Sequence, residues 1–163
     1  MQTDLIDHLA RLGSRFTFQK RPIPIPHELR ADYRMATLLL MLHHCGWKGQ
    51  AALDKLHVLN WALRTNATRQ AMLDRLAGNI HMRDIPVKFD PVFSRAIDLA
   101  RGEGYVERTS TGAIALAPIG RAWLTDILAE SSCLVGEKAF LKSVGKSLTR
   151  DQLQSVLNPS TIW

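Results

Sequence analysis

The sequence has few cysteines and no long apolar run, and each shortage excludes a class of protein. Only two of the 163 residues are cysteine, Cys45 and Cys133, which is too few for a disulfide framework. The longest strongly apolar run, residues 35–42, is far shorter than the roughly 18 residues of a membrane-spanning helix. The first residues lack the basic start and apolar stretch of a secretory signal. We therefore expect a cytoplasmic protein with reduced thiols and no membrane contact.

Motifs for catalysis, cofactors or metals are also missing. No Gly-x-Ser-x-Gly elbow occurs, and Gly145-Lys146-Ser147 lacks the glycine that a phosphate-binding loop needs five positions earlier. His43, His44 and Cys45 are adjacent, and neighbouring helical residues point about 100° apart, so these side chains do not converge on one ion. The sequence therefore predicts a protein without catalytic activity, cofactor or bound metal.

Length and composition fit one globular domain with a single core. Of the 163 residues, 46% are hydrophobic and 22% are charged, which excludes disorder and a large multi-site enzyme. The net charge of +6 favours a polyanionic partner. Residues 91–130 depart from this balance, because four Lys/Arg and five Asp/Glu give that stretch a net charge of −1.

Hydrophobic periodicity predicts a mainly helical protein. Helices are expected over residues 4–12, 29–45, 50–64, 69–76, 90–101 and 118–128. The second of these is apolar nearly all round, so it is either the central core helix or a helix with one face against another subunit.

A β-hairpin is expected directly after the helix at 90–101. Residues 105–108 and 113–116 alternate in polarity around a turn that contains Gly112. The order helix, helix, helix, hairpin, helix predicts a winged helix-turn-helix. In that fold the helix at 90–101 takes the recognition position and the hairpin is the wing.

Three parts are expected along the chain. Residues 1–28 form an N-terminal helix and an extended proline-rich arm, residues 29–130 the winged-helix domain, and residues 131–163 a C-terminal helical extension. The prolines keep the arm extended and leave Ile23 and Ile25 exposed. The arm either straps the protein's own core or docks on a partner.

The recognition-position helix carries two candidate DNA contacts, Arg95 and Arg101, suited to phosphate or to a guanine edge. Asp98 lies between them, and Glu103 and Glu107 follow, so the same surface repels phosphate. The expected wing tip contains no Lys or Arg. The fold therefore favours DNA binding while its charge disfavours the usual mode.

The C-terminal extension has a more basic pattern. Helices are expected over residues 134–148 and 149–157, and four cations recur at every fourth position, namely Lys138, Lys142, Lys146 and Arg150. If the first helix is straight, its three lysines form a ridge that contacts DNA or an acidic partner. A solvated face is the alternative interpretation.

Four short blocks carry a family resemblance. They read Arg-Pro-Ile-Pro-Ile-Pro-His-Glu-Leu-Arg at 21–30, Ala-Leu-Asp-Lys-Leu-His-Val-Leu-Asn-Trp-Ala-Leu-Arg at 52–64, Phe-Asp-Pro at 89–91 with Ala-Ile-Asp-Leu-Ala at 96–100, and Ile-Ala-Leu-Ala-Pro-Ile-Gly-Arg-Ala at 114–122. Together they resemble the middle components of bacterial ABC-three-component systems. The small subunit of Lamassu-type anti-phage defence is similar. The resemblance covers about residues 20–130.

The resemblance implies a non-catalytic winged-helix subunit of an anti-phage defence complex. Such a subunit would bind an SMC-like ABC ATPase and an effector, often a nuclease, and would reach double-stranded DNA through the complex. The family has no catalytic residues to carry over. Apolar anchors dominate interfaces of this kind, and the candidates here are Ile23, Ile25, Leu40 and Trp47, each of which can also be core.

Two other functions stay open at this stage. One is a free-standing winged-helix transcription regulator that binds an operator as a dimer, which would bind duplex alone with a steep salt dependence. The other is a nucleic-acid-processing enzyme, which would need nuclease activity of the pure chain with a divalent metal.

Overall fold

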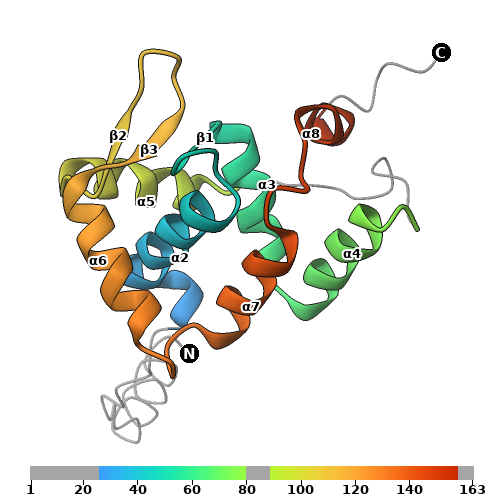
Figure 1. The fold of residues 1–163 in the computed structure, drawn as a ribbon, viewed down its shortest axis with the longest axis horizontal. Helices are drawn as coiled ribbons and strands as arrows, with labels where there is room; N and C mark the ends of the chain where they lie inside the picture. The colour runs from blue at the N-terminus through green and yellow to red at the C-terminus, as the bar shows by residue number, and fades with distance from the viewer. Residues whose placement is uncertain (1–25, 80–88, 158–163) are drawn as a thin grey trace, which may run out of the picture.

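A computed structural model describes residues 26–79 and 89–157 (Figure 1). These residues form seven α-helices, one short 3-10 helix and a small three-stranded antiparallel sheet, so the protein is mainly α. The helices are η1 (His27–Leu29), α2 (Ala31–His44), α3 (Leu53–Leu63), α4 (Asn66–Leu76), α5 (Pro91–Gly102), α6 (Pro118–Ala129), α7 (Val135–Val144) and α8 (Arg150–Leu157). The strands are β1 (Gln50–Ala51), β2 (Val106–Arg108) and β3 (Ile114–Leu116). The expected helix at residues 4–12 and the arm with Ile23 and Ile25 lie outside the described residues.

α2 is the central core helix, which confirms one of the two interpretations of its apolar surface. Residues 36–42 are all buried, and α5, α6 and α7 pack around them (Figure 1). Leu40 is fully buried within this stretch, so its prediction as an interface anchor is wrong. The reason is that α2 has neighbours on nearly every side and leaves no free apolar face.

The three short strands form a sheet of order β1-β3-β2, in which both pairs are antiparallel. The expected hairpin is present as β2 and β3, with Val106 paired to Leu116 and Arg108 to Ile114. These three apolar side chains are buried, while Glu107 and Arg108 are exposed. The hairpin projects beyond the helices, next to α5 (Figure 1). The helix expected over residues 50–64 is wrong at its start, because residues 50–51 form β1 and α3 begins at Leu53. Two residues are too few to show the period of a strand.

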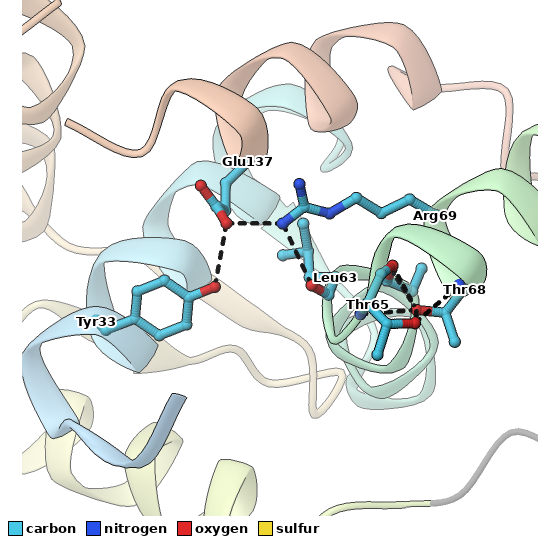
Figure 2. A network of polar contacts seen from close by, with 7 residues as sticks. Tyr33, Leu63, Thr65, Thr68, Arg69 and Glu137 are labelled. Carbon is cyan, nitrogen blue, oxygen red and sulfur yellow. Dashed lines mark hydrogen bonds and ion pairs between the residues drawn. The ribbon is translucent and has the colours of Figure 1, made fainter. Parts of the chain in front are cut away.

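The C-terminal extension shares the core of the rest of the protein. Its buried apolar side chains join the same hydrophobic cluster as those of α2, namely Phe140, Leu141, Val144, Leu148 and Leu153. Figure 2 shows a polar connection as well, in which Glu137 of α7 accepts hydrogen bonds from Tyr33 at 3.3 Å and Arg69 at 2.7 Å. The same view includes the Thr65–Thr68 capping box that begins α4. α7 is therefore fixed to both α2 and α4.

α7 is shorter than expected. It ends at Val144, where Gly145 takes a positive φ of 48°, so the prediction of one helix to residue 148 is wrong. Glycine adopts this conformation at little cost, and residues 145–149 connect α7 to α8 without helix. Across the described residues, no helix is long and apolar enough to cross a membrane.

Candidate functional site

The start of α5 is fixed by Asp90. Its Oδ1 accepts a hydrogen bond from the backbone N–H of Val92 at 2.9 Å, and Pro91 follows as the first helical residue. The Oδ2 atom of Asp90 lies 2.7 Å from the guanidinium of Arg34 on α2, and both side chains are largely buried. Burial opposes ionisation, but the hydrogen bond and charge of Arg34 outweigh it and hold the pKa of Asp90 below its usual value. Asp90 therefore caps α5 and ties it to the core through its ion pair.

The exposed side of α5 carries little free positive charge. Arg95 is exposed and has no ion pair among the described residues. Arg101 is exposed too, but its guanidinium lies 3.4 Å from the carboxylate of Asp98. Glu103 and Glu107 are exposed just beyond the helix. Negative charge therefore offsets positive charge across this face, as the sequence predicted.

An apolar patch lies on the same helix, beside Arg95. Val92 is 46% exposed and Leu99 is 43% exposed, and their spacing places them on one side of α5. Phe89, directly before the helix, is 51% exposed. Ile119, at the start of α6, is 58% exposed, and its Cδ1 lies close to Gly104 at the end of α5. We call these four residues the α5 patch.

A groove lies between α5 and the hairpin, on the other side of this helix from Val92 and Leu99. A cavity of about 200 Å³ lies between α5, the hairpin and Leu53 of α3, and Arg101 and Arg108 line it. The Arg108 guanidinium lies against Gly112 in the turn, so its charge is held near the hairpin tip. The tip itself consists of Thr109, Ser110, Thr111 and Gly112 and carries no charge.

The four cations of the C-terminal extension do not form one helical ridge. Lys138 is on α7, but its Nζ donates a 2.6 Å hydrogen bond to the backbone carbonyl of Glu130. Lys142 is exposed on α7, Lys146 follows the end of that helix, and Arg150 begins α8. The prediction of a continuous ridge is wrong because the chain turns at Gly145.

Lys146 instead meets Trp47. Its Nζ lies 5.0 Å from the centroid of the indole, a cation–π contact between residues 99 positions apart. Trp47 is 65% exposed, more than any other large hydrophobic residue among those described. The Trp47 side chain is therefore accessible to a partner, as expected from the sequence. It contacts the cation of Lys146.

A tight turn presents Trp47. The backbone N–H of Trp47 donates to the carbonyl of Gln50, and the N–H of Gln50 donates back, with Lys48 and Gly49 between them. Both of these residues have positive φ, 52° and 78°, as in a type I′ hairpin turn. A Cβ on Gly46 would collide with the carbonyl oxygens of Leu42 and Gln50, so the sharp exit from α2 requires glycine.

Two further titratable groups are buried. Burial raises the pKa of the Cys45 thiol to about 11, which makes it a poor nucleophile. Burial also lowers the pKa of His57, whose Nε2 lies 3.3 Å from the hydroxyl of Ser94 and whose ring packs edge-on against Phe89 and Phe93. Within residues 26–79 and 89–157, no group of three or more His, Cys, Asp or Glu is arranged to hold a metal ion.

No protein-family model, no curated protein and no solved structure matches the chain.

Two features were missed by the sequence analysis. The contact between Trp47 and Lys146 depends on tertiary packing and has no local signal. The turn does have a local signal, because Lys48-Gly49 fits the two-residue loop of a β-hairpin.

Proposed function

We propose that this protein is a non-catalytic winged-helix subunit that docks on a larger ATPase of the SMC-like class in an anti-phage defence complex. The α5 patch would contact the ATPase or its effector, which we expect to be a nuclease. We place the complex in the cytoplasm and expect it to reach double-stranded DNA through the ATPase. The partners in this proposal come from the family resemblance. The contact surface is inferred from the exposed apolar residues of the α5 patch.

The winged-helix part of the proposal is supported by the order of the elements. α5 directly precedes the hairpin, and β1 lies on the far side of β3, which gives the sheet order β1-β3-β2. α5 therefore has the position of a recognition helix and the hairpin that of a wing.

The single observation that carries the docking proposal is the chemistry of the exposed surface of α5, which is apolar at Val92 and Leu99 and charged on the opposite side, at Asp98 and Arg101. Three apolar side chains are between 43% and 51% exposed at Phe89, Val92 and Leu99, whereas Arg101 is paired with Asp98. A surface that binds duplex DNA needs cations without ion-pair partners to neutralise the phosphates. Exposed apolar clusters of this kind instead mark protein interaction sites.

The test is affinity purification of the tagged full-length chain, co-expressed with its neighbouring genes. We expect an ATPase with an ABC head and a long coiled coil to co-purify in stoichiometric amount. The double variant V92D/L99D should lose it, because each aspartate would be desolvated at the interface. V135D is the matched control, since Val135 on α7 is 59% exposed and lies outside the α5 patch. Equal recovery with V92D/L99D would overturn the assignment of the surface.

A free-standing transcription regulator is the second candidate, and Arg95 favours it. Arg95 is the exposed cation on α5 that has no ion pair among the described residues, and it occupies the recognition position. A regulator would bind one duplex sequence tightly without a partner, and R95A would abolish that binding. Under the docking proposal, R95A leaves recovery of the ATPase unchanged.

A further inference from the structure

A second surface, on the turn between α2 and β1 and separate from the α5 patch, combines an exposed indole with several cations. Its members come from four parts of the chain, namely Trp47, Lys48, Arg121, Lys142 and Lys146. We call them the Trp47 patch. All five side chains are exposed. We propose that the Trp47 patch binds single-stranded nucleic acid, with a base stacked on the indole and the cations on the phosphates.

Three of the four cations belong to the turn or contact it. Lys48 is part of the turn itself, and Lys146 lies over the ring of Trp47. The guanidinium nitrogens of Arg121 would lie 3.4 Å from a Cβ on Gly49, so this side chain borders the turn. Lys142 is close to His44, three residues before Trp47. Its charge adds to the effect of burial in lowering the pKa of that imidazole.

No described residue forms an ion pair with the cations of the Trp47 patch. In the part of the chain that the structure describes, the ion pairs link Arg30, Arg34, Arg69 and Arg101 to carboxylates, and none involves a cation of the Trp47 patch. The acidic residue of α7, Glu137, is held by Arg69 and Tyr33 (Figure 2). Lys146 at the indole, and three further cations on or near the turn that carries it, form a site for an anion that also has aromatic faces.

Nucleic acid fits this combination better than an acidic peptide. A chain of glutamates would gain from the four cations but has no ring to stack on the indole. In a duplex the base faces are already stacked on one another, whereas a single strand leaves them free. A site of this kind tolerates many sequences, because every base has a π-face.

The geometry of the turn allows a precise substitution. Lys48 has a φ of 52°, in the left-handed region that is unfavourable for most side chains. Asparagine is preferred there, and Asn-Gly is the favoured pair for a type I′ turn. K48N therefore removes one charge while keeping the turn, so that loss of binding cannot be ascribed to loss of the fold.

The experiment is fluorescence anisotropy of the isolated full-length chain with labelled 20-nucleotide dT and rU strands, a 20-base-pair duplex and polyglutamate. We expect micromolar binding of the single strands at low salt, with a log–log salt slope of about −3 for four phosphate contacts. W47A should weaken binding on the order of ten- to 100-fold, the usual effect of losing one stacked base. K48N should reduce the steepness of the slope by about 0.7. R95A should change nothing, since this exposed arginine is on α5.

Several outcomes would overturn the proposal. One is unchanged binding of both single strands by W47A and K48N, with both variants shown to be folded by circular dichroism. Others are polyglutamate binding as tight as that of dT, or duplex binding tighter than single-strand binding. Binding of dT alone or rU alone would support the site and assign it to DNA or RNA. The result is independent of the proposed function, because no ATPase is present and the α5 patch is untouched.

Discussion

The ion pair between Arg34 and Asp90 gives the most direct prediction about stability. The two side chains are 11% and 14% exposed, and their charged atoms are 2.7 Å apart. Asp90 also caps α5 through its other oxygen, at 2.9 Å from the N–H of Val92. D90A would remove the cap and leave the guanidinium of Arg34 without its carboxylate.

The expected loss follows from these two contributions. Loss of an N-cap costs about 1 kcal/mol. Breaking a buried ion pair costs roughly 3–5 kcal/mol, and the lower end applies here because both side chains retain some contact with water. We therefore expect D90A to lower the free energy of unfolding by about 4 kcal/mol. D90N keeps the cap and an acceptor for Arg34, so it should cost roughly half as much.

Urea denaturation followed by far-UV circular dichroism measures this difference. The pKa of folded Asp90 is lower than that of the unfolded chain, so its ionisation stabilises the fold above the unfolded pKa. This contribution is lost as the pH falls through the folded value. The deficit of D90A should therefore shrink below about pH 4. A deficit under 1 kcal/mol at pH 7 would refute the importance of this pair for holding α5.

Two further predictions concern buried titratable groups. Burial holds the pKa of folded His57 below its usual value, against the opposing charges of Asp54 and Asp90, so the protein should lose stability as the pH falls below about 6.5. H57Q should flatten that pH dependence, and an unchanged profile would show that His57 is not its source. Cys45 is 1% exposed with a pKa of about 11, whereas Cys133 is exposed. A thiol reagent at pH 8 should therefore label Cys133 at once and Cys45 only after unfolding. Immediate labelling of the C133S variant would contradict the burial of Cys45.

Local signals in the sequence predicted much of the fold. The cap at Asp90, the proline after it and the alternating residues of the hairpin each act within a few positions. α5, β2 and β3 accordingly lie within two residues of their expected places. The apolar period of α5 also matches its burial, because Phe93, Ala96, Ile97 and Ala100 are all buried.

The failures arose where tertiary contacts decide the outcome. Leu40 looks like an exposed anchor only if α2 has a free side, and the packing of α5, α6 and α7 removes that side. The lysine ridge assumed a straight helix through Gly145, whose positive φ ends α7. Trp47 and Lys146 meet because α7 packs beside the end of α2, which no local pattern encodes.

The central claim is that the exposed side of α5 serves a protein partner and does not read duplex DNA by itself. Selection of duplexes from a random library by the isolated full-length chain, at physiological salt, tests this most directly. We expect no enriched sequence and no duplex bound at nanomolar concentration. Enrichment of one sequence with nanomolar affinity, abolished by R95A, would contradict the account.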